Sequence, residues 1–229
     1  MLRAVRAVLF DFDHTLGVDH KLEERVLRAL AAEECGLHPS NADLSAILRR
    51  FRSGIAPLGA ALVDGVRSLG CTLADPDAFV SRYKAQALRL APESVTPMPG
   101  ARETLRALAD LRMPTGILSN GWTELQHRKA DLIGFEGPTI ASEEIGAWKP
   151  DPAAFLTAAR RMGLSHQATL YVGDDPAIDI AGAKSAGMLA AWVDSGPAPY
   201  PSGIASPDVA LTSLAELPGL LEAQGAAPA

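Results

Sequence analysis

Short apolar runs that alternate with helical patterns occupy most of the sequence. Four runs have the length and the Val, Leu, Ile or Phe content of buried strands: Val5–Phe10, Pro114–Leu118, Thr169–Val172 and Leu189–Val193. Three stretches between or after them have helical spacing: Ala101–Leu111, Pro152–Met162 and Pro176–Ala186. This alternation predicts βαβ units, so the expected fold class is α/β with a parallel sheet.

One long segment, from about residue 18 to residue 97, breaks the alternation. It shows no strand-like run and four stretches of helical spacing: Lys21–Glu34, Asn41–Phe51, Leu58–Leu69 and Pro76–Leu90. Glycines and prolines separate these stretches, as turn residues do. We therefore expect a helical insert over 18–97 and a core made of 1–17 and 98–229.

Composition and charge narrow the class of protein. Of the 229 residues, 48 % are hydrophobic and 21 % are charged, as in ordinary globular domains. The formal net charge is −6 and the basic residues are dispersed, which argues against a nucleic-acid partner. No apolar stretch approaches a membrane span, and the first one is too short for a signal peptide. We expect a cytoplasmic monomer or homodimer without a membrane partner.

The two cysteines, Cys35 and Cys71, are not spaced like metal ligands. A disulfide between them is one interpretation. Two reduced thiols in a reducing compartment is the interpretation that the sequence favours.

Two acids follow the first predicted strand, where Asp11 and Asp13 flank Phe12. Carboxylates this close repel, so they need a cation, a shared proton or strong donors. Mg²⁺ prefers such oxygen ligands, and a carboxylate can also attack phosphorus. Two solvated loop acids remain the alternative.

Polar residues also follow the second strand. Ser119, Asn120 and Gly121 precede a helical pattern, where a hydroxyl and free N–H groups can hold phosphate. A simple helix N-cap is the alternative. Lys149, ahead of another helix, could neutralise nearby acids and hold a phosphoryl group, or could be a solvated surface lysine.

A second acidic cluster, Asp174, Asp175 and Asp179, directly follows the predicted strand Thr169–Val172. Asp174, nearest the strand, is the expected direct metal ligand. Asp179 would ligate through water or hold Lys149, while the helix dipole alone could explain Asp175 and Asp179. Because parallel strands end at one edge of a sheet, all these groups are expected to form one site.

These motifs together resemble the haloacid dehalogenase-like hydrolase superfamily, in its phosphatase branch with a helical cap of the C1 type. The matching motifs are DFDHTL at 11–16, ILSN at 117–120, Lys149–Pro150 and GDDPAID at 173–179. The resemblance implies a Rossmann-like core with an inserted α-helical cap, over 18–97, that closes over the active site and selects the substrate.

The resemblance also assigns roles. It makes Asp11 the nucleophile that forms an aspartyl-phosphate, and Asp13 the general acid that later activates water. Ser119, Asn120, Gly121 and Lys149 would bind the substrate, with Ser119 and Lys149 also counted as catalytic. Mg²⁺ would be held by Asp11, Asp13 (through its backbone carbonyl) and Asp174, supported by Asp175 and Asp179. We expect the carboxylates of Asp11, Asp13 and Asp174 to converge and Lys149 to point at Asp11.

The implied function is Mg²⁺-dependent hydrolysis of a small phosphorylated metabolite. Asp13 favours a phosphate ester over a haloacid, because an alkoxide leaving group needs a proton and a halide does not. The stretch SNGWTELQHRKADLIG is similar to nucleotidase-like branches. A phosphotransferase or phosphomutase acting on a sugar phosphate, and a non-catalytic binding module that kept the fold, remain as alternatives.

Overall fold

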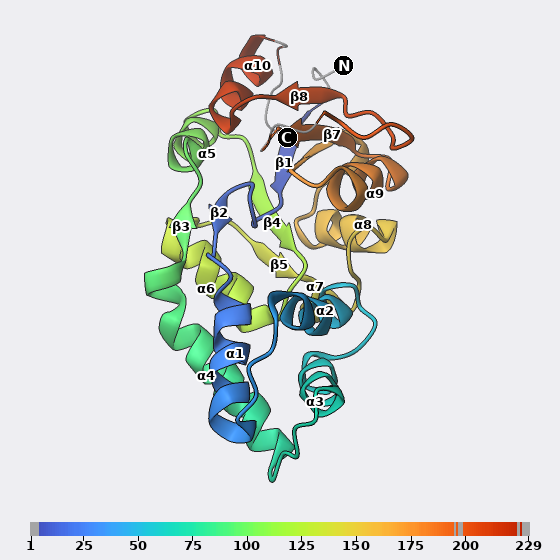
Figure 1. Ribbon diagram of the computed structural model, residues 1–229. Coiled ribbons are helices and arrows are strands. Elements are labelled where there is room, and N and C mark those ends of the chain that lie inside the picture. The colour runs from blue at the N-terminus through green and yellow to red at the C-terminus, as the bar shows by residue number, and fades with distance from the viewer. Residues whose placement is uncertain (1–4, 195, 197–198, 224, 226–229) are drawn as a thin grey trace. The chain divides into compact units, whose positions relative to one another are not determined.

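The computed structural model describes residues 5–194, 196, 199–223 and 225 (Figure 1). Its chain divides into two compact units. The first, called the core unit here, contains the described residues up to Val18 and from Thr96 onward, and the second, the insert, is Asp19–Val95. The ends of the predicted core, 1–4 and 226–229, lie outside the described residues. The interpretation of the insert as a cap stays a prediction.

A parallel six-stranded sheet forms the centre of the core unit, as the alternation predicted. Its strands follow one another in the order β5 (Thr139–Ala141), β4 (Thr115–Ser119), β1 (Ala7–Phe10), β6 (Thr169–Gly173), β7 (Leu189–Val193) and β8 (Val209–Leu211). β1 is central, and its last residue Phe10 pairs with Ile117 on one side and Val172 on the other. The carboxyl ends of β1, β4 and β6 therefore lie together. The strands β5 and β8, of three residues each, were not predicted from the sequence.

Helices pack against this sheet in two groups. α8 (Pro152–Arg161) contacts α9 (Ala181–Ser185), and both pack over Leu9, Leu118 and Tyr171. α5 (Ala101–Asp110) contacts α10 (Leu217–Ala223), as Figure 1 also shows. α6 (Thr123–Ile133) follows β4, and the single-turn α7 (Ser142–Ile145) follows β5. Single 3₁₀ turns lie at His166–Ala168 and Leu214–Glu216.

One predicted helix is divided in two. The stretch expected to be helical over Pro176–Ala186 begins as a π-helical turn at Pro176–Ile180 and continues as α9. A π turn widens the helix locally and is frequent at functional sites. This turn carries Asp179, which is why the irregularity matters for the site.

The insert consists of four helices close to the predicted ones: α1 (Leu22–Cys35), α2 (Asn41–Arg52), α3 (Leu58–Ser68) and α4 (Pro76–Ser94). Their starts follow local chemistry. Ser40 and Asp43 form a capping box at α2, and the Asp75 side chain accepts the Ala78 N–H (2.9 Å) at α4.

The prediction of two separate thiols is wrong for this structure. Cys35, at the end of α1, is joined in a disulfide to Cys71, just beyond α3, with Cα atoms 5.3 Å apart. That separation is within the disulfide range. The cysteines are 36 residues apart in sequence, and only the folding back of the intervening helices brings them together.

The chain leaves and re-enters the core unit through a two-stranded antiparallel ladder. β2 (Gly17–Val18) pairs with β3 (Thr96–Pro97), with Val18 opposite Thr96. Across the described ranges, no helix combines the length and the apolar character that crossing a membrane requires.

Candidate active site

Asp11 follows β1 in the middle of the parallel sheet. Its backbone N–H donates to the Val172 carbonyl (2.8 Å), which extends the ladder between β1 and β6 by one residue. The side chain is nearly buried, and burial raises the pKa of Asp11 to about 6. The Lys149 ammonium opposes this rise and the Asp179 carboxylate adds to it.

Lys149 points at Asp11, as expected from the sequence. Its Nζ lies 2.6 Å from Asp11 Oδ1, 2.7 Å from Asp179 Oδ1 and 2.8 Å from the Tyr171 hydroxyl. These three contacts match the three protons of an ammonium group. Burial disfavours the charged amine, but the Asp11 and Asp179 carboxylates outweigh it and hold the pKa of Lys149 well above its usual value. The surface-lysine alternative is therefore excluded.

The Asn120 side chain fixes the backbone of Lys149. Its Nδ2 donates to the Lys149 carbonyl (2.9 Å), and its Oδ1 accepts from the Lys149 N–H (2.9 Å) and from the Ser142 hydroxyl (2.6 Å). Asn120 was predicted to bind the substrate. That role stays a prediction, and the side chain ties the loop that carries Lys149 to the end of β4.

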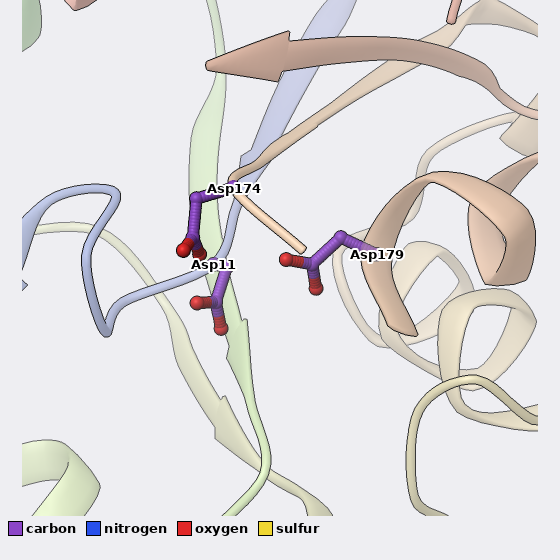
Figure 2. Close-up of side chains that lie close together, drawn as sticks. All are labelled: Asp11, Asp174 and Asp179. Carbon is purple, nitrogen blue, oxygen red and sulfur yellow. The ribbon is translucent and has the colours of Figure 1, made fainter. Parts of the chain in front are cut away.

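Three carboxylates converge beside Lys149, and Figure 2 shows them directed toward a common space. Asp11, Asp174 and Asp179 each offer one oxygen, and these oxygens lie within 4.8 Å of one another. Burial, together with the charges of Asp11 and Asp179, outweighs the lowering by Lys149 and raises the pKa of Asp174 to about 8. The group thus has more negative charge than its one ammonium offsets.

Asp179 fits into this group because residue 173 is a glycine. A Cβ atom at Gly173 would collide with the Asp179 carboxylate. The Asp179 Oδ2 atom also accepts the Asp175 N–H (3.1 Å). Any side chain at position 173 would therefore displace Asp179 from Lys149.

The donor set fits a hard divalent cation. It consists of carboxylate oxygens, which such ions prefer, and a cation would relieve the repulsion that raises the pKa of Asp174. Asp11 and Asp174 are the residues placed to hold it, since both carboxylate oxygens of Asp179 are engaged, Oδ1 by Lys149 and Oδ2 by the Asp175 N–H. The Thr15 hydroxyl, 3.5 Å from Asp174 Oδ1, and the Trp192 indole, which donates to the Asp174 carbonyl (2.9 Å), keep Asp174 in place.

The Asp13 carboxylate does not join this convergence, so that expectation is wrong for its side chain. Asp13 Oδ1 lies 2.6 Å from Lys129 Nζ, on α6. The cause is the turn after β1, in which the N–H groups of Leu16 and Gly17 both donate to the Phe12 carbonyl (2.9 Å each). In an extended strand, Asp11 and Asp13 would point to the same side. The turn interrupts the extended backbone, so their side chains diverge.

The remaining predicted residues divide between the site and helix capping. Ser119 is buried at the end of β4, and the N-cap of α6 is Trp122, so Ser119 is not a simple cap. Gly121 lies between them, and the next helical N–H, of Thr123, donates to Glu143 (3.0 Å) rather than being free. Asp175 does cap the π turn, accepting the N–H groups of Ala177 and Ile178 (2.8 and 2.9 Å).

The sequence interpretation missed Tyr171 and Lys129. Tyr171 lies inside a fully buried strand, where its hydroxyl requires a partner, and this was an available signal. Lys129 shares the buried face of α6 with Leu125, Ala130 and Ile133, so its charge in an apolar stripe was a second signal.

Comparisons with known proteins point to one family of hydrolases. The family model described as haloacid dehalogenase-like hydrolase matches residues 5–187. The glyceraldehyde 3-phosphate phosphatase of Methanopyrus kandleri is 31 % identical over 209 residues, covering 84 % of this chain and 85 % of the relative. The pyrimidine 5′-nucleotidase YjjG of Escherichia coli is 34 % identical over 133 residues, 56 % of this chain and 58 % of the relative.

A dehalogenase is also among the similar structures. The 2-haloacid dehalogenase of Pseudomonas syringae pv. Tomato superposes with a TM-score of 0.71 and 29 % identity, covering 96 % of this chain and 99 % of that one. The similar proteins thus include enzymes that act on phosphate esters and enzymes that act on carbon–halogen bonds.

Proposed function

We propose that this chain, which belongs to the haloacid dehalogenase-like hydrolase family, is a Mg²⁺-dependent phosphatase that acts on a small phosphorylated metabolite. The observation that carries the proposal is the charge imbalance after β1, where three converging carboxylates share one ammonium. A phosphatase needs a cation there to accept a substrate that is itself an anion.

The proposed reaction has two steps. A carboxylate oxygen of Asp11 attacks phosphorus, the bond from phosphorus to the ester oxygen breaks, and the leaving oxygen takes a proton from Asp13. Water then attacks the phosphorus of the aspartyl-phosphate and gives a proton to Asp13, while the bond between phosphorus and the Asp11 oxygen breaks, which releases phosphate. Together the two steps return Asp11 and Asp13 to their starting states.

Other residues would hold the transferring group. Ser119 and the backbone at Gly121 would bind phosphoryl oxygens, and Lys149 would offset their charge while keeping Asp11 oriented. Asp11, Asp174 and the Asp13 carbonyl would hold Mg²⁺, with Asp179 in support through Lys149. Mg²⁺, when bound, supplies positive charge that offsets the carboxylates and the phosphoryl oxygens.

Dehalogenation is the competing function that the comparisons raise. Two features of this chain favour the phosphatase. Asp13 offers a proton donor two residues after the nucleophile, which a halide leaving group does not require. The acid cluster gives a cation site, which a phosphate ester needs for its charge.

The substrate class follows from two relatives. A similar protein is named a glyceraldehyde 3-phosphate phosphatase and another a pyrimidine 5′-nucleotidase. We propose a small phosphomonoester of one of these kinds, with nucleotides as the first to test. A phosphotransferase would use the same residues, and only its product, a phosphorylated acceptor rather than free phosphate, would differ.

The test is turnover of p-nitrophenyl phosphate with Mg²⁺ and with EDTA, beside release of halide from 2-haloacids. We expect phosphate release only with Mg²⁺, and no halide. Asp11→Asn should abolish turnover, and Asp110→Asn, which removes an exposed acid at the end of α5, should not change it. Halide release without phosphate release would refute the phosphatase.

A further inference from the structure

A buried lysine outside the acid cluster lacks a role in the reaction as described so far. Lys129 is only 1 % exposed, and its Nζ lies 2.6 Å from Asp13 Oδ1 and 5.0 Å from the centroid of the Phe12 ring. Lysine is almost never fully buried unless it is paired. The pair connects α6 to the turn after β1.

Packing alone does not account for this residue. Lys129 shares its helix face with Leu125, Ala130 and Ile133, all buried. An apolar side chain of similar length would fill the same space without removing a charge from water. A buried ion pair adds little stability compared with such packing, and the contact with Asp13 is one through which the amine can act on the reaction.

We propose that Lys129 is a positioning residue that holds the Asp13 carboxyl group where it can exchange a proton with the leaving oxygen and with water. This inference rests on the proposed phosphatase function. Without the lysine, the Asp13 side chain, which is 39 % exposed, can rotate into solvent. A misplacement of about 1 Å can cost a reaction about 100-fold.

The role has a signature that a purely structural role lacks. Proton donation matters most for a basic leaving group and least for one that leaves easily as an anion. Loss of the positioning residue should therefore slow the hydrolysis of phenyl phosphate far more than that of 2,4-dinitrophenyl phosphate. p-Nitrophenyl phosphate should lie between them.

The experiment measures kcat/KM for these three esters with Mg²⁺, in the wild type and in Lys129→Met. We expect a loss of about 100-fold on phenyl phosphate and less than about 5-fold on 2,4-dinitrophenyl phosphate. Asp13→Asn should rank the three esters in the same way, with a larger loss on each. Adding Lys129→Met to Asp13→Asn should cost almost nothing more, because the lysine acts through the acid.

Two further variants guard the interpretation. Arg128→Met, which removes the neighbouring exposed cation on α6, should leave all three rates unchanged. Lys129→Arg keeps the charge and should retain more of the rate on phenyl phosphate than Lys129→Met does. It replaces Lys129→Met in the experiment if the methionine variant does not fold. Melting temperatures of all variants identify any loss of folded protein.

Three results would overturn the inference. Equal losses on all three esters would make Lys129 a structural residue, and unchanged rates would leave it without influence on Asp13. Additive losses in the double variant would place its effect elsewhere. A wild type that is inactive on every ester would instead refute the phosphatase proposal, and with it the premise of this inference.

Discussion

Two buried charged clusters, one in each unit, are built on different balances of charge. In the insert, the nearly buried Glu23 lies 2.6 Å from Arg52 Nη2 and accepts the Tyr83 hydroxyl (3.0 Å). The Arg52 guanidinium offsets Glu23 directly and lies farther, 3.7 Å, from the less buried Glu24. In the core unit, Asp11, Asp174 and Asp179 share the ammonium of Lys149. The first cluster is satisfied within the fold, and in the proposed function the second would be completed by a cation and a substrate.

The difference teaches how to distinguish a stabilising cluster from a functional one. A buried charge with a partner has little left to bind. A group of carboxylates with raised pKa values and too few cations lowers stability, and such groups are typical of functional sites.

The largest effect is expected from Lys149→Met, which leaves three carboxylates without an ammonium. Turnover with Mg²⁺ should fall at least about 1,000-fold, since the charge that orients Asp11 and binds the phosphoryl group is lost. Steady-state rates on p-nitrophenyl phosphate measure this. Arg128→Met, which removes an exposed cation, should retain full activity, and an active Lys149→Met would contradict the assignment.

The next effect is the pH dependence of stability in the metal-free protein. The pKa values of Asp11 and Asp174 are raised to about 6 and about 8, above the 3.8 of the unfolded chain. Between pH 4 and 8 the unfolded state thus binds fewer protons than the folded state. The free energy of unfolding should therefore fall by a few kcal/mol as the pH rises through this range.

The raised pKa of Lys149 also makes stability fall with rising pH, but only above this window. Its raised pKa stabilises the fold fully below the pKa of an unfolded lysine, about 10.4, and so gives no slope between pH 4 and 8. Urea titrations in EDTA at several pH values measure the expected slope. Mg²⁺ should stabilise the protein more at pH 8 than at pH 5, and a pH-independent Mg²⁺ effect would contradict the charge imbalance.

Asp174→Asn should make the metal-free protein more stable while removing its metal response. At pH 8 the neutral amide avoids the repulsion from Asp11 and Asp179, and the expected gain is about 2 kcal/mol, or roughly 4–8 °C in Tm. Thermal melts in EDTA test the gain in stability, and melts in Mg²⁺ test the loss of the metal response. A variant that melts lower in EDTA would show that Asp174 is structural.

Arg52→Met tests the cluster around Glu23, and it should lower stability, whereas Asp174→Asn should raise it. Glu23 would remain buried without its guanidinium, at a cost of about 2 kcal/mol after allowance for the partial exposure of Arg52. The Tm should fall by a few degrees and its shift with Mg²⁺ should be unchanged. Arg49→Met, an exposed arginine on the same helix, is the matched control.

The smallest effect is expected at His14, beside the unbalanced cluster. His14 has a φ of 61°, in the left-handed region, which asparagine occupies more readily than most residues. His14→Asn should gain only a few tenths of a kcal/mol, as urea unfolding would measure. A large change would mean that the turn, and not the charge, dominates the stability of this end of the sheet.

The sequence predicted the parallel sheet and the grouping of its motifs because strand length and helical spacing are local properties. Asp11, Asp174 and Lys149 come together since parallel strands end at one edge. The direction of the Asp13 side chain was not predictable from spacing. It depends on the hydrogen bonds of the turn from Phe12 to Gly17.

Side chains that act across elements were also missed. Periodicity assigns Tyr171 and Lys129 to buried faces, and it does not say which polar group meets them there. The Cys35–Cys71 disulfide was missed for the same reason, because it depends on how α1 packs with the helices that follow. Which side chains meet across two elements depends on how the elements pack, and the hydrophobic pattern of the sequence does not give that information.

The ladder between β2 and β3 has a consequence for how this chain could change over evolution. Val18 and Thr96 are paired neighbours, so the chain departs from the core unit and returns at adjacent positions. For the topology of the sheet, the whole insert is a connection between two adjacent positions, as a short turn would be. Lengthening, replacing or shortening it leaves the order β5-β4-β1-β6-β7-β8 unaffected. The chemistry and the insert can therefore be inherited as separate modules.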